Sequence, residues 1–500
     1  MRYQSTRGDI KKISGAQAIV SGLSSDGGLF VPESFPGISL KTVTELVRES
    51  YSSRAAFIMS LFLDDFSIEE LSGYTNAAYN AEHQCGFDRG DTAPLHGTDR
   101  STFFLELWHG PTCAFKDMAL QVMPKLLTAS LEKTGEKRDV CILVATSGDT
   151  GKAALEGFRN IHGTTIIVFY PHRGVSDVQK LQMVSQDGTN VNVIAVDGNF
   201  DDAQTGVKVI FNDEELRTKL SDSGYFLSSA NSINWGRLVP QVAYYFSAYC
   251  DLIKYGKINI GEKINFCVPT GNFGNILAAY YAERMGLPIN KLICASNRND
   301  VLTQFINTGV YDKNRPFYTT VSPSMDILVS SNLERLLFEL SDKDGKTVAS
   351  YMSALAADGF YNVPEAAGAE LKRIFASGQC SEEDTSKTIG DIFNRYGYLT
   401  DTHTAVAYKV LSDYRAITGD GTTAVVVSTA SPFKFCESVL EALGLPHNSS
   451  GVELIDALSR ATGVPVPAPL AELKSKSPRF CKLVATGGMK KAVLDFLGGR

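Results

Sequence analysis

Short runs of consecutive hydrophobic residues alternate with stretches of helical periodicity from about Phe103 onward. Each run has the length of a strand and is apolar at successive positions, which is typical of strands buried on both faces. Such strands alternating with helices indicate parallel sheets covered by helices on two sides. The runs fall into two separated groups, so we expect an α/β protein with two doubly wound parallel-sheet lobes and a cleft between them. The predicted strands are Val140–Val144, Ile166–Tyr170, Val191–Val196, Ile264–Val268, Leu292–Ala295 and Ala424–Val427.

The two ends of the chain have a different pattern. Gly27–Pro32 predicts a turn into a short extended segment, and Leu40–Asn80 is mostly helical in its spacing. The segment from about residue 441, with a turn at Pro465–Pro467, carries no motif that we can assign. We therefore expect an N-terminal module over 1–95, α/β lobe regions over 96–260 and 261–440, and a C-terminal segment over 441–500.

Composition and charge exclude some classes of partner. The chain of 500 residues has a formal net charge of -7 and a pI near 5.6, which argue against nucleic acid or an anionic membrane as partner. No apolar run approaches the length of a membrane span, and the polar N-terminus lacks the apolar core of a signal peptide. The nine cysteines stand singly, without the spacing of a zinc site or a redox pair. We expect no metal and a cytoplasmic location.

One loop has the features of an anion site. Pro269–Asn275 (PTGNFGN) joins the predicted strand Ile264–Val268 to a helix that begins near Ile276. Glycines allow backbone N–H groups to converge on an anion, and a helix N-terminus adds partial positive charge. The loop has neither the lysine of a Walker loop nor the spacing of a dinucleotide-binding loop. Taken alone, a phosphate monoester site and a plain tight turn are equally good interpretations.

A second loop, Thr146–Gly151 (TSGDTG), offers three hydroxyls and a carboxylate just before a helix that begins near Lys152. These groups suit a substrate carboxylate or phosphate. By itself, however, an ordinary helix N-cap made by the serine or the aspartate explains the loop better.

A third segment places Lys116 in an apolar stretch, Cys113–Met118. Loss of hydration lowers the pKa of an ammonium group, as amine nucleophiles and Schiff-base lysines require. A single lysine is far more often a solvated surface residue, so this segment in isolation favours that reading.

Taken together, the segments match one family in order. His109–Leu120 resembles the lysine motif of the threonine synthases, Ala145–Gly151 their ATSGDTG loop, and Pro269–Asn275 their phosphate loop. Tyr3–Gly8 and Asp26–Pro32 resemble the N-terminal signature of the long bacterial and fungal branch. The resemblance runs from residue 3 to about 435. It implies a pyridoxal-phosphate enzyme of fold type II (tryptophan synthase β-like) with an additional N-terminal module.

The resemblance assigns cofactor roles to individual residues. Lys116 would form the Schiff base with pyridoxal 5'-phosphate and then act as the proton shuttle. Thr429, in a segment similar to the family's STAHPAKF, would place its hydroxyl against the pyridine nitrogen, and Phe115 would pack beside the lysine. The cofactor phosphate would be bound by backbone amides of Gly271, Asn272, Phe273, Gly274 and Asn275, with the side chain of Asn272 or Asn275.

The resemblance also assigns substrate contacts, to Thr146, Ser147, Asp149, Thr150, Asn234 and Arg237. Arg237 would meet the leaving phosphate, because a guanidinium binds an oxyanion through two N–H groups; a structural ion pair is the alternative. The role of Asp149 stays open, because related enzymes have an asparagine there that touches the O3′ of the cofactor. A carboxylate would repel that phenolate, so orienting the loop amides is the alternative.

Three residues depart from the family pattern. Ser431 stands where a histidine is expected, Phe433 and Lys152 where small residues are. Lys152 would assist a phosphate or be solvated. These departures bear on rate and substrate fidelity rather than on the chemistry of Lys116.

The reaction implied is the last step of threonine biosynthesis, in which O-phospho-L-homoserine and water give L-threonine and phosphate. One alternative is a threonine-synthase-like phospho-lyase that releases a 2-oxo acid, ammonia and phosphate, which would share every motif. Another fold-type-II enzyme, such as a dehydratase or cysteine synthase, fits the N-terminal module less well. A non-enzymatic binding protein fits poorly with an intact Lys116. Monomer and homodimer are both open.

Overall fold

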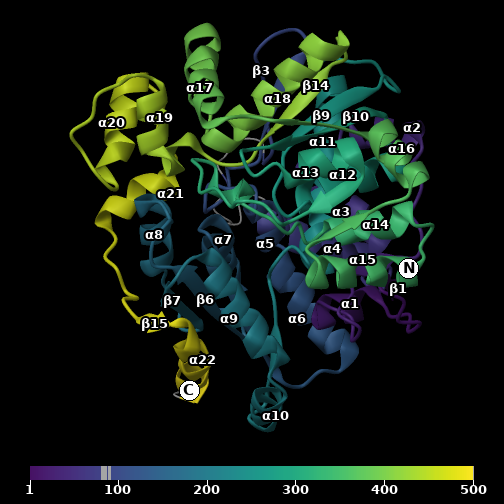
Figure 1. Ribbon diagram of the computed structural model, residues 1–500, viewed down its shortest axis with the longest axis vertical. Helices are drawn as coiled ribbons and strands as arrows, with labels where there is room; N and C mark the ends of the chain where they lie inside the picture. The colour runs from purple at the N-terminus through teal and green to yellow at the C-terminus, as the bar shows by residue number, and fades with distance from the viewer. Residues whose placement is uncertain (80–86, 88–91, 499–500) are drawn as a thin grey trace.

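The computed structural model describes residues 1–79, 87 and 92–498, so Asn80 and Cys85 lie outside it. The N-terminal residues form a small module at one side of the molecule (Figure 1). Strand β1 (Tyr3–Ser5) pairs antiparallel with β2 (Phe30–Pro32), which confirms the extended segment predicted after Gly27.

Helices occupy most of the stretch predicted to be helical. They are α2 (Leu40–Leu46), α3 (Tyr51–Phe62) and α4 (Ile68–Tyr79), and α1 (Gly15–Ser21) precedes them. Each of the first three helices of the module begins at a serine whose hydroxyl accepts a backbone N–H of the first turn, as N-caps do. These serines are Ser14, Ser39 and Ser50.

A six-stranded sheet forms the core of the larger lobe. Five of its strands are parallel, and β3 runs antiparallel to β4 at one edge. In spatial order the strands are β13 (Phe375–Gln379), β10 (Ile289–Ser296), β9 (Ile264–Pro269), β14 (Ala424–Ser428), β4 (Thr102–Glu106) and β3 (Leu95–Gly97).

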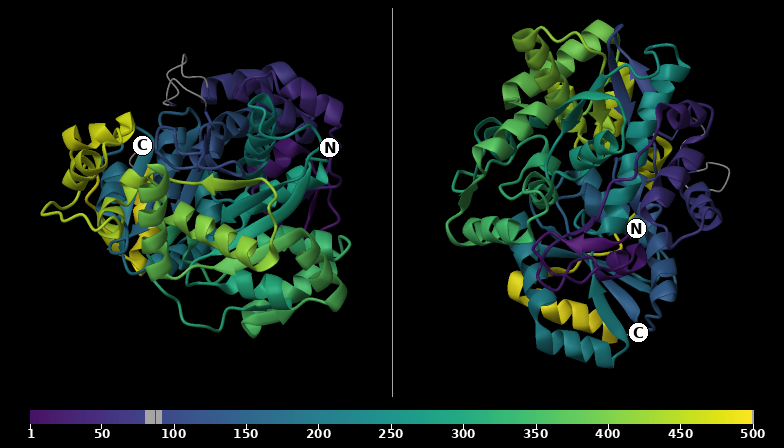
Figure 2. Two further views of the ribbon diagram at one scale, coloured as in Figure 1. Left: turned by 90° about the horizontal axis from the view of Figure 1, so that it is seen from above. Right: turned by 90° about the vertical axis from the view of Figure 1, so that its right-hand side faces the viewer.

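A five-stranded, fully parallel sheet forms the core of the second lobe. Its order is β15 (Leu483–Ala485), β7 (Val191–Asp197), β6 (Thr164–Pro171), β5 (Asp139–Ala145) and β8 (Tyr225–Ser228). The two sheets lie in different halves of the molecule, as Figures 1 and 2 show. The predicted architecture of two α/β lobes is therefore confirmed.

Both faces of the central strands are buried by helices. In β5, Cys141 and Leu143 pack with α9 (Phe200–Asn212) and α22 (Met489–Gly498), whereas Val140 and Ile142 belong to the large core on the other face. Successive residues of a strand point to opposite faces. The continuous apolar runs thus follow from burial on both sides.

The remaining helices connect the strands. In the five-stranded lobe and its approach they are α5 (Asp117–Leu120), α6 (Met123–Thr134), α7 (Asp149–Phe158), α8 (Asp177–Val184) and α10 (Glu214–Asp222). Ser176 caps α8 through its side chain, which accepts the N–H of Gln179. In the larger lobe they include α11 (Trp235–Lys254), α12 (Gly274–Arg284), α13 (Val301–Thr308), α14 (Leu333–Leu340), α15 (Gly345–Ala357), α16 (Glu365–Ile374), α17 (Glu382–Tyr396) and α18 (Thr402–Thr418), with the hairpin β11 (Val310–Asp312) and β12 (Phe360–Asn362).

Each of the two sheets takes strands from more than one of the regions expected from the sequence. Strands β3 and β4 pair within the six-stranded sheet, although they precede β5 in the chain. The C-terminal segment contributes β15 to the edge of the five-stranded sheet, beside β7. Its helices are α19 (Cys436–Ala442), α20 (Glu453–Thr462), α21 (Ala468–Ala471) and α22. The chain therefore crosses between the lobes, and the boundaries proposed from sequence stay a prediction.

Two further findings concern the part of the chain that is described. None of its helices is both long and apolar enough to cross a membrane. No disulfide joins any of the cysteines within it.

Candidate active site

A cavity of about 1530 Å³ lies where segments of both lobes meet. Its lining includes Lys116, Thr146, Gly271 and Thr429, which follow strands β4, β5, β9 and β14 respectively. Ligands of open α/β sheets bind outside the carboxyl ends of their parallel strands. The three segments singled out from the sequence are thus brought together at the expected place.

The glycine loop, Gly271–Asn275, leaves its polar hydrogens available. Among the described residues, none accepts a hydrogen bond from its backbone N–H groups. Phe273 has φ 62°, in the left-handed region, and no side chain caps the N-terminus of α12. A Cβ at Gly271 would lie 2.5 Å from the carbonyl oxygen of Ser324, so this position requires glycine. The loop thus has N–H groups without a described acceptor at a helix N-terminus, which is the kind of place where anions bind.

The two asparagines of the glycine loop differ in their surroundings. Asn275 is buried, and its Oδ1 accepts hydrogen bonds from the hydroxyls of Tyr244 and Tyr245 at 2.5 and 2.6 Å. Its Nδ2 is buried without a partner in the described structure. Asn272 is exposed and donates nothing from its side chain that the structure records. Asn275 is thus the better candidate for a side-chain donor to an anion.

Lys116 is buried and lies between Asp149 and Ser324. Its Nζ is 3.5 Å from Oδ2 of Asp149 and 3.3 Å from Oγ of Ser324, and it lies over the ring of Phe115. Burial lowers the pKa of Lys116 to about 8; Asp149 acts in the opposite direction, and the positive charges of Arg237 and Lys434 add to the lowering. The lowered pKa increases the fraction of Lys116 that is the neutral amine, which is the form that acts as a nucleophile.

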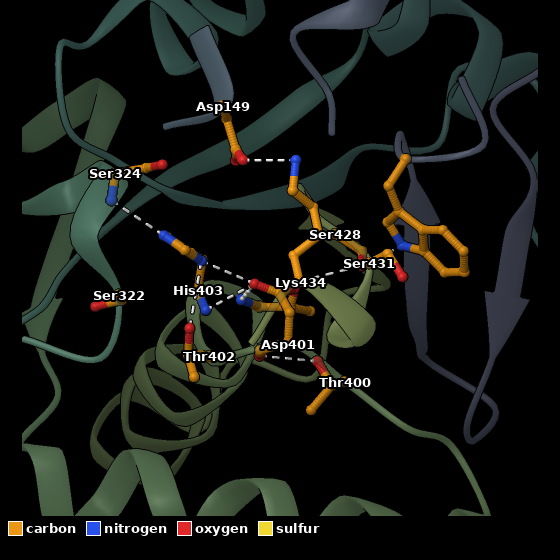
Figure 3. Close-up of polar contacts among 12 residues, drawn as sticks. Asp149, Ser322, Ser324, Thr400, Asp401, Thr402, His403, Ser428, Ser431 and Lys434 are labelled. Carbon is orange, nitrogen blue, oxygen red and sulfur yellow. Dashed lines mark hydrogen bonds and ion pairs between the residues drawn. The ribbon is translucent and has the colours of Figure 1, made fainter. Parts of the chain in front are cut away.

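The carboxylate of Asp149 contacts lysine side chains rather than the backbone amides of its loop. Its Oδ1 lies 2.7 Å from Nζ of Lys434 (Figure 3). The same oxygen accepts a hydrogen bond from Nε2 of Gln179 at 2.7 Å. Burial disfavours its ionisation, but Lys434 and Lys116 outweigh that effect and hold the pKa of the carboxyl well below its usual range. Asp149 is not among the residues that line the cavity.

Thr146 binds the amides that we considered as a role for Asp149. Its Oγ1 accepts the N–H groups of Gly148 and Gly151 at 3.0 and 2.9 Å. This segment, Thr146–Gly151, is called the aspartate loop below. Thr146, Ser147 and Thr150 line the cavity.

Lys152 does not belong to the site. It is buried and is not among the residues that line the cavity, and its Nζ bonds to Glu156 and Gln186. The solvated position considered for this lysine is therefore wrong, and its place in an ion pair with Glu156 gives no support to a contact with phosphate.

Arg237 and Asn234 lie at the start of α11. Arg237 is buried, lines the cavity and donates from Nη1 to the carbonyl of Ala230 at 2.8 Å; no ion pair is recorded for it. Burial lowers its pKa to about 10. Asn234 caps α11 through its Oδ1 and donates Nδ2 to the carbonyl of Ile19, so both ends of its amide are used in the fold.

Thr429 lies next to the lysine segment. Its carbonyl accepts the N–H of Phe115 at 2.8 Å, and Ala114 forms an isolated antiparallel bridge to Ala430. The departure Ser431 accepts the N–H of Phe433 and donates its own N–H to Cys113, while the Phe433 ring is buried in a hydrophobic cluster. Both departures are therefore accommodated in the turn that presents Thr429.

The sequence did not single out four residues at this site: Gln179, Ser324, His403 and Lys434. His403 lines the cavity, and its Nε2 accepts the backbone N–H of Ser324 at 3.2 Å (Figure 3). Its Nδ1 therefore carries the proton and donates to Asp401 at 2.9 Å. The available signal was slight: Asp401 as an N-cap for α18, and one isolated histidine after it.

Three family models match the chain. "Threonine synthase N terminus" covers residues 2–79, "Pyridoxal-phosphate dependent enzyme" covers 92–430, and "Threonine synthase, C-terminal" covers 404–493. The threonine synthase of Pseudomonas aeruginosa is 40% identical over 443 residues, which are 88% of this chain and 90% of that protein.

Two further similarities agree. Threonine synthase-like 1 of Homo sapiens is 41% identical over 86% of this chain, and the chain spans 58% of the length of that relative. The crystal structure of PLP-bound threonine synthase from Brucella melitensis superposes with a TM-score of 0.87 at 36% identity and covers 99% of both chains.

Proposed function

The chain belongs to the threonine synthases, within the pyridoxal-phosphate-dependent enzymes, and we propose that it converts O-phospho-L-homoserine and water to L-threonine and phosphate. The observation that carries the proposal is the similarity to a threonine synthase over nine-tenths of that protein, together with a buried Lys116 beside the glycine loop.

The residues of the site fit pyridoxal 5'-phosphate. The unpartnered Nδ2 of Asn275 and the N–H groups of the glycine loop match the acceptor oxygens of a phosphate monoester. We assign Lys116 as the covalent attachment point and the Thr429 hydroxyl as the partner of the pyridine nitrogen. When bound, the cofactor supplies the electron sink for the carbanions of this chemistry.

The chain's own residues supply the proton transfers and the binding contacts. Lys116 would take the proton from Cα and then from Cβ, and return one at Cγ after the phosphate departs. As water adds at Cβ, Lys116 would take a proton from that water and return one at Cα, and the remaining proton leaves with the phosphate. A single base near all three carbons serves these steps. Arg237, a buried cation on the cavity wall with no carboxylate partner among the described residues, is our candidate for binding the phosphate of the substrate. Thr146, Ser147 and Thr150 are candidates for its carboxylate.

The product distinguishes the proposed reaction from the phospho-lyase alternative. A threonine synthase-like protein is as similar to this chain as the threonine synthases are, so sequence alone does not separate the two. Incubation with O-phospho-L-homoserine should release phosphate and threonine in equal amounts. Phosphate accompanied by a 2-oxo acid and ammonia would establish the lyase instead.

Replacement of Lys116 tests the assignment of the catalytic base. Lys116→Ala should abolish covalent capture of pyridoxal phosphate and lower turnover by about 10²–10⁴-fold. Lys125→Ala, on α6 and away from the cavity, is the matched control and should retain both. Borohydride-fixed cofactor on any lysine other than Lys116 would contradict the assignment. We also propose a cytoplasmic location, in keeping with cysteines that form no disulfide in the described chain.

A further inference from the structure

Asp149 lies between two buried lysines. Its Oδ1 is 2.7 Å from Nζ of Lys434, and its Oδ2 is 3.5 Å from Nζ of Lys116. The side chain of Lys434 is 0% exposed and that of Asp149 2%. A buried ion is stable only when it is paired, so the shorter contact identifies Lys434 as the principal partner of this carboxylate.

The position of Lys434 is fixed from a second direction. Its Nζ also donates to the carbonyl of Thr112 at 2.9 Å. Thr112 is itself held by Asp117, which accepts its N–H and its hydroxyl at 2.9 and 2.7 Å. The residues that precede Lys116 in the chain thus hold the ammonium of Lys434 against Asp149.

Lys116 is held less tightly than Lys434. At 3.5 Å its contact with Asp149 is longer than a charge-assisted hydrogen bond, and its other polar neighbour is the Ser324 hydroxyl at 3.3 Å. The remaining charges that bear on it are Arg237 from α11 and Lys434. His403 of α18 lines the same cavity and bonds to Ser324, and Asp117 is occupied by Thr112.

We propose that Lys434 is a positioning residue, the fixed counter-ion of Asp149 that leaves Lys116 free to act as a neutral amine. The inference rests on the proposed covalent role of Lys116. Without Lys434, the carboxylate of Asp149 would have Lys116 as its nearest cation. Lys116 would then be held as an ammonium ion, which has no lone pair and forms no covalent bond to an aldehyde.

The pH dependence of cofactor capture measures this effect. Full-length chain stripped of cofactor is mixed with pyridoxal 5'-phosphate, and covalent capture is followed by absorbance and by borohydride fixation at each pH. In the unaltered chain the rate should rise with a midpoint near pH 8, where Lys116 loses its proton. Lys434→Met should move the midpoint upward by about 1 unit or more, and so slow capture about tenfold at neutral pH. Lys434→Arg keeps a cation and should leave the midpoint within a few tenths of a unit.

Whether Lys434 acts on Lys116 through Asp149 is tested by repeating the Lys434→Met measurement in a chain that also carries Asp149→Asn. Asp149→Asn should lower the midpoint, and Lys434→Met should then shift it much less than it does beside an intact Asp149. Equal shifts in the two backgrounds would overturn the inference, because Lys434 would then act on Lys116 directly. Unchanged midpoints for Lys434→Met would overturn it as well.

A fallback is needed if Lys434→Met does not fold. Asp149→Asn alone then decides, and a midpoint equal to that of the unaltered chain overturns the inference.

Two outcomes distinguish failure of the inference from failure of the proposed function. If fixation maps the cofactor to a lysine other than Lys116, the proposed function and the inference both fall. If the cofactor is captured normally on Lys116 and the pH midpoint does not change in Lys434→Met, the inference falls and the proposed function stands.

Discussion

The glycine loop and the aspartate loop occupy matching positions, yet they differ in how many of their polar groups the described chain satisfies. Each follows a parallel strand and opens a helix, α12 in one case and α7 in the other. The glycine loop carries no charge and leaves its N–H groups and the Nδ2 of Asn275 without protein acceptors in the described chain. The aspartate loop binds its own amides through Thr146 and carries a carboxylate that Lys434 neutralises.

This difference separates two kinds of site that look alike in sequence. The buried Nδ2 of Asn275 has no partner in the described chain, and a buried donor without a partner destabilises the fold, so the glycine loop gains from a bound anion. The aspartate loop has no buried side-chain donor of this kind in the described chain, and Thr146 accepts two of its N–H groups. We therefore propose that the glycine loop binds the permanent phosphate of the cofactor and the aspartate loop the transient substrate.

The largest effect is expected when the glycine loop is given a carboxylate, like that of Asp149 in the aspartate loop. Asn275→Asp would place a buried carboxylate beside two tyrosine hydroxyls, and no described cation contacts the side chain at this position. An uncompensated buried charge costs about 3–5 kcal/mol, and here it would also repel the phosphate. We expect the dissociation constant for pyridoxal phosphate, measured by equilibrium dialysis, to rise more than about 100-fold.

The exposed neighbour provides the control for this change. Asn272→Asp makes the same chemical substitution on a side chain in contact with solvent, where screening is strong. Its effect on cofactor affinity should be less than about fivefold. Equal losses from the two variants would show that burial at Asn275 does not matter, and would remove it from the phosphate site.

A smaller effect is expected from adding a methyl group to the glycine loop. In Gly271→Ala the new Cβ would meet the carbonyl oxygen of Ser324 at 2.5 Å, a backbone atom on the turn that contacts Lys116. Overpacking of this kind costs about 1–3 kcal/mol, and we expect cofactor affinity to fall accordingly. In Gly274→Ala the nearest atoms are side chains at 3.4 Å, so affinity should change little. Reversal of this order in the same dialysis measurement would exclude close backbone approach as the reason for Gly271.

The sequence predicted six of the central strands and both loops, because their burial and their chemistry are local. It missed the central strand β4, which has only three apolar residues in succession, and the edge strands β3, β8, β13 and β15, which have part-exposed, irregular burial patterns. Such strands lack the continuous apolar run of a strand buried on both faces. These edge strands form because they pair with a neighbouring strand in the folded protein, which their own sequence pattern does not show.

The site shows the same limit. Lys116 and the glycine loop are identified by motifs, whereas the partner of Asp149 is set by folding. Lys434 stands in a segment that we compared with the family, but nothing in that segment pairs it with a residue of a distant loop. His403 is linked to Lys116 through Ser324, a contact between segments far apart in the sequence. Buried charge pairs of this kind are read from structure, not from spacing.

The smallest effect is expected from removing the hydrogen bonds that Thr146 forms within the aspartate loop. Thr146→Val keeps the shape of the side chain and removes the acceptor for the N–H groups of Gly148 and Gly151. We expect a loss of about 1–2 kcal/mol in the free energy of unfolding and a several-fold rise in KM for O-phospho-L-homoserine. Cofactor affinity should stay within about twofold, since the glycine loop is unchanged.

Ser147→Ala is the control: it removes a cavity hydroxyl for which no hydrogen bond within the loop is recorded, and it should raise KM without the loss of stability. If Thr146→Val weakened the cofactor and spared the substrate, the assignment of the two loops would have to be exchanged, because the loop that depends on its own acceptor would then be the one that holds the permanent anion.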